Sequence, residues 1–206
     1  MFYTATIPSW FMKLNPSLVW KIPTEKKELF LTFDDGPHET VTPFILGQLK
    51  KYNAKATFFC IGKNVKHYPN VYEQILNDGH AVGNHTFDHT NGWKAKNGAY
   101  INSIVEAAKY IDSKLFRPPY GKISPFVSKV LRKKLGYRII MWNVLSADFD
   151  ENISPEKCTE NVLLHTKPGS IIVFHDSTKA WERMSISLPK ILSHFTEKGF
   201  VFKAIM

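Results

Sequence analysis

Two adjacent carboxylates, Asp34 and Asp35, follow the apolar run Leu29–Phe33 and precede the pair Gly36-Pro37. The run has the length and composition of a buried strand, and the glycine–proline pair ends it. Two like charges at a strand end repel each other, so one carboxylate becomes hard to ionise unless a cation lies nearby. A metal ion would be such a cation, with one carboxylate as its ligand and the other free to move protons. The alternative is ordinary turn chemistry, in which an aspartate caps the next helix.

Two histidines, His85 and His89, are spaced four residues apart. In a helical turn this spacing places both imidazoles on one side, where they can share a metal ion. One carboxylate and two histidines leave coordination positions open for water and substrate, which is typical of catalytic zinc sites. The alternative for the two histidines is an exposed or capping role.

Two further motifs carry groups that could bind a carboxylate or transfer a proton. Arg117 belongs to the stiff, proline-containing turn Phe116–Gly121, where it could hold a carboxylate bidentately or lie on the surface. His175 ends an apolar run and is followed by Asp176. It could protonate a leaving group if a carboxylate such as Asp148 raises its pKa. The alternatives are a structural histidine for His175 and a loop cap for Asp148.

The elements that must position these groups alternate between strands and helices after about residue 28. This alternation favours a parallel sheet covered by helices, as an open sheet or a barrel. In both folds, functional groups gather at the C-terminal ends of the strands. The predicted strands are Glu28–Asp34, Ala56–Ile61, His80–Asn84, Tyr137–Val144, Ser170–Phe174 and Phe200–Ile205.

The helices are predicted from spacing and from their end signals. Apolar residues at helical spacing predict one helix from Ile101 to Leu115. A Thr or Ser followed by proline predicts helix starts at Thr42, Ser124 and Ser154. Gly136 is placed where a helix should end.

The bulk composition is that of an ordinary globular protein. The chain has 206 residues, 44% hydrophobic and 22% charged, which is enough for one sizeable core. Its two cysteines are too few for a disulfide framework, and Cys60 lies in an apolar run where a buried, inert thiol is expected.

The net charge of +9 is compatible with a polyanionic or cell-wall substrate. Because the basic residues are scattered and no nucleic-acid-binding motif accompanies them, we expect no nucleic-acid partner. No stretch approaches the roughly 20 apolar residues of a membrane span. Without a clear secretory signal we expect a cytoplasmic location, with association with the cell envelope left open. The sequence does not indicate an oligomeric state.

Taken in order, these motifs resemble those of the polysaccharide deacetylases, the nodulation-type chitooligosaccharide deacetylase homology domain of carbohydrate esterase family four. The resemblance spans about residues 28–206, which we predict to be the catalytic domain, with residues 1–27 as an extension packed on it. The matching segments are Thr32–Pro37, Ala56–Phe59, Gly79-His80, Gly83–Thr86 with His89, Arg117–Gly121, Trp142 with Asp148, and His175-Asp176.

The resemblance implies a distorted, incomplete (β/α) barrel and a divalent metal ion, usually Zn²⁺. It makes Asp35, His85 and His89 similar to the family's metal ligands. Asp34 is similar to the general base, and Arg117 to the arginine that orients this base.

The resemblance also implies a general acid and a set of substrate-binding residues. His175 is similar to the general acid, and Asp148 to the carboxylate that polarises it. The backbone N–H of Tyr120 is similar to the group that helps hold the oxyanion, with Pro119 and Trp142 as further substrate-binding residues.

The implied activity is hydrolysis of N-acetyl groups on an amino-sugar oligomer or polymer, such as peptidoglycan or a chitin-like saccharide. The alternatives are an esterase for O-acetyl groups on a xylan-type polysaccharide and a non-catalytic carbohydrate- or metal-binding domain. Three positions depart from the family pattern. Thr90 replaces a usual proline, and Leu145 and Phe149 replace an aspartate and a tryptophan.

Overall fold

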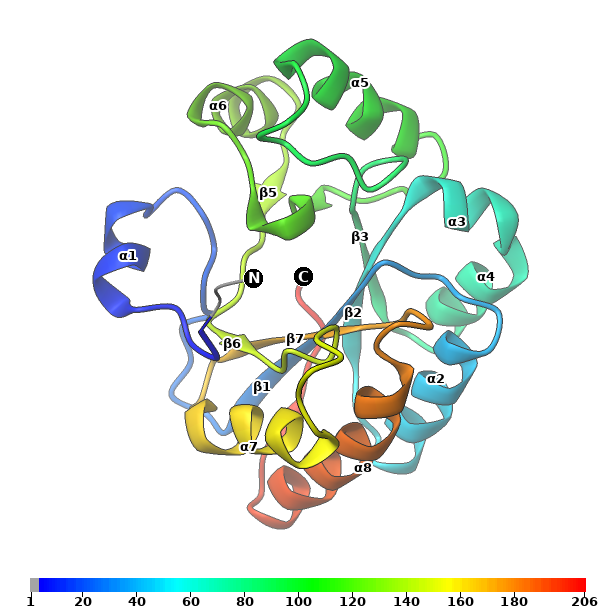
Figure 1. Cartoon of the computed structure of the whole chain (residues 1–206), viewed down its shortest axis with the longest axis vertical. Coiled ribbons are helices and arrows are strands. Elements are labelled where there is room, and N and C mark those ends of the chain that lie inside the picture. The colour runs from blue at the N-terminus through cyan, green and yellow to red at the C-terminus, as the bar shows by residue number, and fades with distance from the viewer. Residues whose placement is uncertain (1–3) are drawn as a thin grey trace.

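The computed structural model describes residues 4–206, in which helices surround a curled sheet (Figure 1). The strands are β1 (Glu28–Asp34), β2 (Ala56–Cys60), β3 (Ala81–Asn84), β4 (Leu115–Phe116), β5 (Arg138–Ile139), β6 (Val144–Leu145), β7 (Ile171–His175) and β8 (Val201–Phe202). The helices are α1 (Ser9–Leu14), α2 (Val41–Lys51), α3 (Gly62–His67), α4 (Pro69–Asn77), α5 (Asn97–Ala107), the 3₁₀ turn η1 (Pro119–Gly121), α6 (Pro125–Lys134), α7 (Pro155–His165) and α8 (Trp181–Glu197).

The sheet follows the order β5-β4-β3-β2-β1-β7-β6, and β8 pairs with the start of β1. All of these strand pairs are parallel. The sheet curls, yet its edge strands β5 and β6 do not pair with each other in the described path. The fold is therefore an incomplete (β/α) barrel, and the predicted fold class is confirmed.

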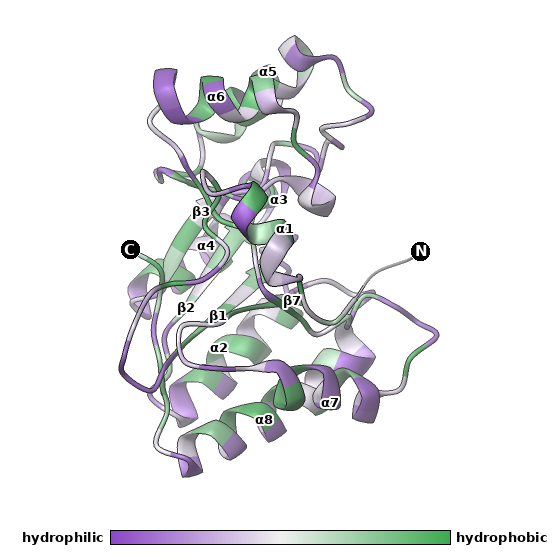
Figure 2. Ribbon diagram, turned by 90° about the vertical axis from the view of Figure 1, so that its left-hand side faces the viewer, coloured by the Kyte–Doolittle hydropathy of each residue, from purple (hydrophilic) through white to green (hydrophobic). Residues whose placement is uncertain are grey.

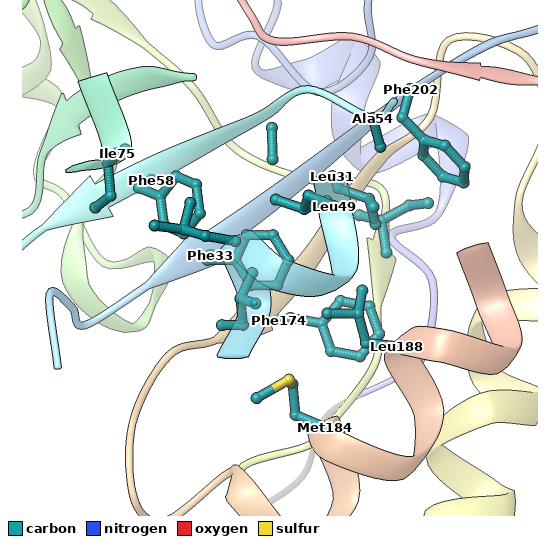
Figure 3. Close-up of a cluster of buried hydrophobic side chains, with 14 of the residues drawn as sticks. Leu31, Phe33, Leu49, Ala54, Phe58, Ile75, Phe174, Met184, Leu188 and Phe202 are labelled. Carbon is teal, nitrogen blue, oxygen red and sulfur yellow. The ribbon is translucent and has the colours of Figure 1, made fainter. Parts of the chain in front are cut away.

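The main core lies between the sheet and the helices outside it. The ring of Phe33 on β1 lies 5.1 Å from that of Phe58 on β2 and 6.1 Å from that of Phe174 on β7. Figure 3 shows these rings in one cluster with Met184 and Leu188 of α8. Burying each of these side chains contributes about 1.5–3 kcal/mol, so this layer fixes the central strands firmly.

Alternation along β1 determines which side chains enter the barrel. Leu31 and Phe33 belong to the outer core, whereas Phe30 belongs to a smaller cluster with Phe59. Successive strand residues point to opposite faces, so Asp34 lies on the same face as Phe30 and Thr32. The strand itself therefore directs one carboxylate of the pair into the barrel.

The predicted strand Tyr137–Val144 is wrong as one unit, because it divides into β5 and β6. The chain changes partners between them: the N–H of Ile140 donates to Phe116 at the end of β4, and that of Asn143 to Ile171 on β7. Residues 140–143 thus cross the open side of the barrel, and a segment that crosses between partners cannot stay in one regular ladder.

The segment 4–22 lies against this crossing. The carbonyl of Ala5 accepts from Leu145 at 2.8 Å, and that of Val19 accepts from Met141 at 2.7 Å. Lys21 forms a further bridge to Ser170. The division between an extension and a catalytic domain at residue 28 stays a prediction.

Two helix predictions are corrected. The helix predicted to reach Leu115 ends at Ala107. Leu115 instead begins the short buried strand β4. Thr42 is not a cap but the second residue of α2, and its hydroxyl donates to Asp176 at 2.7 Å.

The other end signals are confirmed. Ser124 and Ser154 accept hydrogen bonds from the first turns of α6 and α7. Gly136 follows α6 with a φ of +71°, and Cys60 is fully buried.

Figure 2 shows α5 and α6 at one end of the molecule and α2, α7 and α8 at the other. Within residues 4–206, we find no helix that combines the length and the apolarity needed to cross a membrane.

Candidate active site

The polar residues of interest follow directly after buried parallel strands. Asp34 ends β1 and stands in register with His175, the last residue of the neighbouring strand β7. His85 follows β3, and Arg117 follows β4. Because the strands are parallel, their C-terminal ends meet at one mouth of the barrel.

A carboxylate and two histidines converge at this mouth. Oδ1 of Asp35 lies 3.6 Å from Nε2 of His85 and 3.2 Å from Nε2 of His89. The three ligand atoms all lie within 4.8 Å of one another.

The two histidines lie on a loop, so the interpretation of their spacing as a helical turn is wrong. Thr86 and His89 have φ values of 65° and 58°, which turn the loop twice and bring both rings to the same side. The hydroxyl of Thr90, at the position where the resemblance implies a proline, donates to Asp88 and lies 3.1 Å from the hydroxyl of Ser103. Hydrogen bonds thus hold this loop in place of a proline ring.

The chain bends at Asp35 itself, one residue before Gly36-Pro37. Asp35 has a φ of 83°, so its side chain leaves the alternation of the strand. Its carbonyl accepts a hydrogen bond of 2.7 Å from the side chain of Asn64 on α3. This bend allows two neighbouring aspartates to reach the same mouth from what would otherwise be opposite faces.

The cluster fits a cation. Nδ1 of His85 faces the carbonyl of Arg117 at 2.8 Å and donates to it when the ring is neutral, which turns a bare Nε2 toward Asp35. Burial lowers the pKa of His85 to about 3, and His89 acts in the same direction, so the ring is neutral at pH 7. Oδ1 of Asp35 is buried and accepts no hydrogen bond from the described residues. Electron-rich atoms that face each other in this way suit a divalent metal ion.

The other carboxylate, Asp34, is held by Arg117. Its Oδ1 accepts a bond of 2.6 Å from a guanidinium that is 0% exposed, so the interpretation of Arg117 as a surface residue is wrong. The same guanidinium donates to the hydroxyl of Thr32 and to the carbonyls of Ile140 and Met141. Arg117 therefore fixes Asp34 from inside the barrel.

An acid–base pair lies beside Asp34 on β7. Nδ1 of His175 is 2.7 Å from Oδ1 of Asp148, and the other carboxylate oxygen accepts from the backbone N–H of His175. Burial alone would lower the pKa of His175, but the carboxylates of Asp148, Asp35 and Asp34 together outweigh it, Asp148 most of all, and the pKa rises to about 10. His175 is therefore an imidazolium at neutral pH.

Arg183 is a supporting residue that the sequence reasoning missed. It is buried on α8, and its Nε donates to the carbonyl of Asp148 at 2.7 Å. The signal was present, because Arg183 falls on the apolar side of α8 beside Met184 and one turn before Ser187.

Asp176 fastens the bend after Asp35. Its carboxylate accepts from the N–H of Gly36 and the hydroxyl of Thr42, each at 2.7 Å. Burial raises the pKa of Asp176 to about 8, although both donors act in the opposite direction. Sequence reasoning marked Asp176 as a neighbour of His175 but not as an anchor for the Asp35 loop.

We expect Gly36→Ala to destabilise the protein by about 1–3 kcal/mol and to weaken metal binding. A Cβ at Gly36 would lie 1.9 Å from Oδ2 of Asp176, which is buried and cannot move away. Urea unfolding and a zinc titration measure the two effects. The matched control is Gly47→Ala in α2, which meets nothing within 4 Å and should stabilise the helix slightly. Equal behaviour of the two variants would contradict the anchoring role.

The predicted substrate-binding residues differ in how exposed they are. Tyr120 is 50% exposed with a φ of 60°, and its ring lies 4.6 Å from that of His89. Trp142 is half-buried, 5.7 Å from the Arg117 guanidinium, and Pro119 is buried. Their roles toward substrate stay predictions.

Leu145 and Phe149, which depart from the family pattern, differ in their surroundings. The ring of Phe149 lies 5.4 Å from that of His175, at the mouth of the barrel. Leu145 is buried in β6, so this substitution falls in the interior.

A hollow of about 580 Å³ opens on the α3 side of the cluster. It is lined by Lys63, Asn64, Lys66, His67, Tyr68 and Phe87. One of these lining residues, Asn64, donates its side-chain N–H to the backbone carbonyl of Asp35.

Comparison with known proteins gives a consistent set of relatives. The family model described as polysaccharide deacetylase matches residues 21–140. A peptidoglycan-N-acetylglucosamine deacetylase of Bacillus cereus is 37% identical over 187 residues, covering 87% of this chain and 67% of the relative. A chitooligosaccharide deacetylase of Azorhizobium caulinodans is 37% identical over 163 residues, covering 76% of this chain and 77% of the relative.

Among solved structures, a peptidoglycan N-acetylglucosamine deacetylase in complex with a naphthalenyl N-hydroxybenzamide superposes with a TM-score of 0.88. It is 33% identical, and the match covers 95% of this chain and 94% of that one. The similarity therefore extends through the whole barrel, including the strand ends that carry the cluster.

Proposed function

The chain belongs to the polysaccharide deacetylase family, and from this we infer that it is a metal-dependent hydrolase that removes N-acetyl groups from an amino-sugar polymer. The observation that carries the proposal is the arrangement at one barrel mouth. A carboxylate–histidine–histidine cluster lies there beside a carboxylate held by arginine and a histidine held by aspartate. The names of the relatives support peptidoglycan or chitin-like saccharides as the substrate class.

Asp35, His85 and His89 would hold the metal ion, with Zn²⁺ as the expected one. The ion would supply Lewis-acid polarisation of the acetyl carbonyl. These three residues use their side chains for binding, so the proton transfers fall to other groups.

Asp34 is the proposed general base. Arg117 keeps its carboxylate in one orientation, and a carboxylate is the form that accepts a proton from the attacking water. The backbone N–H of Tyr120, on the neighbouring turn, is the proposed donor to the oxyanion. Asp34 and His175 stand in register on adjacent strands, so a base and an acid flank the same opening.

His175 is the proposed general acid that protonates the departing amine. Its Nδ1–H donates to Asp148, which stabilises the imidazolium and leaves the Nε2 proton for transfer, so the acid form persists up to a pH of about 10. No covalent intermediate with the protein is required, because the nucleophile is water and the acid and base are separate residues.

We expect Asp148→Asn to shift the alkaline limb of the pH–rate profile to lower pH. The substitution removes the largest of the charges that raise the pKa of His175, so burial lowers that pKa against the smaller effects of Asp35 and Asp34. Activity at pH 8–9 should fall by about 10-fold or more, with a smaller loss near pH 6. A pH series of kcat/KM measures this. The control is His175→Gln, which has no titrating acid at this position and should show no alkaline limb. An unchanged limb in Asp148→Asn would contradict the assignment.

The same pair predicts the pH dependence of stability. Because the folded-state pKa of His175 is raised above its ordinary value of 6.5, the stabilisation is complete below that value. It is lost as the pH rises through about 10. Asp148→Asn should remove this alkaline loss in urea unfolding.

The proposed function is tested by acetate release from N-acetylglucosamine oligomers, peptidoglycan and acetylated xylan, with and without chelator. We expect release from the amino-sugar substrates that stops on chelation. Release from acetylated xylan alone would favour the ester hydrolase. Zinc binding without release from any saccharide would favour the non-catalytic alternative.

A further inference from the structure

Two side chains on the loops after His89 and Tyr120, Trp93 and Lys122, have no role in the reaction described above. Trp93 is 69% exposed, and Nζ of Lys122 lies 5.0 Å from its ring. Lys122 is two residues after Tyr120, whose ring lies against His89, and Trp93 is four residues after His89. An indole and an ammonium group thus sit together on the two loops that follow His89 and Tyr120.

The backbone holds this pair in place. The N–H of Trp93 donates to the side chain of Asn91 at 3.0 Å, which fixes the turn before the indole. A Cβ at Gly92 would lie 2.3 Å from the carbonyl oxygen of Lys122, so the two loops are in close backbone contact. Because both loops are held, the indole is exposed on a rigid support rather than on a free segment.

We propose that Trp93 and Lys122 form a subsite for a sugar that carries a carboxylate, adjacent to the sugar that is deacetylated. This rests on the proposed function. The flat, apolar face of an indole suits stacking on the C–H face of a pyranose ring, and such exposed aromatic area next to a site is typical of a binding surface. The ammonium group beside it pairs with an acidic substituent.

The charge of Lys122 makes this proposal specific. A neutral chitin-like chain offers the indole its sugar face but offers the ammonium group no partner. A glycan whose amino sugars carry carboxylates, as peptidoglycan does, satisfies both groups. The subsite therefore selects the acidic glycan over the neutral one, in keeping with the net charge of +9.

The test measures binding by calorimetry in the zinc-loaded Asp34→Asn protein, where the glycan is not consumed. The ligands are a peptidoglycan-derived glycan that retains its carboxylates and the N-acetylglucosamine tetramer. Trp93→Ala should weaken both by about 5–30-fold. Lys122→Gln should weaken the acidic glycan about 2–5-fold and leave the tetramer unchanged.

Matched controls lie elsewhere on the surface. Trp10→Ala removes an indole of similar exposure, 64%, from α1, and Lys190→Gln removes an exposed ammonium group from α8. Neither should change binding by more than about twofold.

Three results would overturn the subsite: no binding of either glycan, Trp93→Ala behaving as Trp10→Ala does, or Lys122→Gln affecting both glycans alike. Acetate release by the wild-type protein is measured separately. Loss of binding in Trp93→Ala without wild-type turnover would keep the subsite and reject the proposed reaction. Turnover by the wild-type protein together with normal binding in Trp93→Ala would keep the proposed reaction and reject the subsite.

Discussion

Replacing Asp34 by asparagine is expected to lower acetate release by about 10³-fold while one zinc ion per chain stays bound. The carboxylate of Asp34 faces Arg117 and not the histidines, so the change removes the proposed base and leaves the cluster intact. Asparagine can still accept a hydrogen bond from Arg117, and the fold should persist. Steady-state acetate release and metal analysis of the same samples measure both quantities.

The neighbouring residue provides the matched control for this prediction. Asp35→Asn makes the same chemical change one position along the chain, but in the cluster with His85 and His89. It should weaken zinc binding strongly and lose turnover for that reason. Near-normal rates in Asp34→Asn, or zinc loss in both variants alike, would show that the two roles are assigned wrongly.

Replacing Arg117 by methionine is expected to destabilise the protein by about 3–5 kcal/mol. The guanidinium is fully buried and donates to one carboxylate, one hydroxyl and two carbonyls, all of which would lose their donor. Leaving Asp34 charged and unpaired in the barrel causes most of the loss. Urea unfolding measures the change in the free energy of unfolding.

A second substitution separates the ion pair from packing. In Arg117→Met/Asp34→Asn the uncompensated charge is gone, so the double variant should be less destabilised than the sum of the single ones by about 1–3 kcal/mol. Arg138→Met, at an exposed arginine on β5, should stay within about 0.5 kcal/mol of wild type. Additive losses in the double variant would contradict a coupled pair.

The sequence predicts the central strands well and the edge strands badly, for a physical reason. β1, β2 and β7 are buried on both faces and read as continuous apolar runs such as Leu29–Phe33. β4 has two residues, too few for any periodicity, and its Leu115 also fits the spacing of the preceding helix. The crossing between β5 and β6 depends on Val19 and on the partner strands, which no local pattern records.

Within the site, residue types were predictable but conformations were not. The spacing of His85 and His89 indicated that the two side chains share a metal ion. The loop brings them together through left-handed backbone at Thr86 and His89. The bend at Asp35 and the anchoring of its loop by Asp176 are likewise tertiary effects. The division of roles between Asp34 and Asp35 came from family resemblance and stays a prediction; in the structure the two carboxylates have separate partners.

The most direct test of metal-dependent deacetylation is a zinc titration of the metal-free protein, followed by acetate release from an N-acetylglucosamine oligomer. The account predicts that the rate rises in proportion to bound zinc and levels off at one equivalent. It also predicts that His89→Ala gives no turnover at the same zinc concentration, because one of the three converging ligand atoms is lost. Full turnover by the chelated protein, or by His89→Ala, would contradict it.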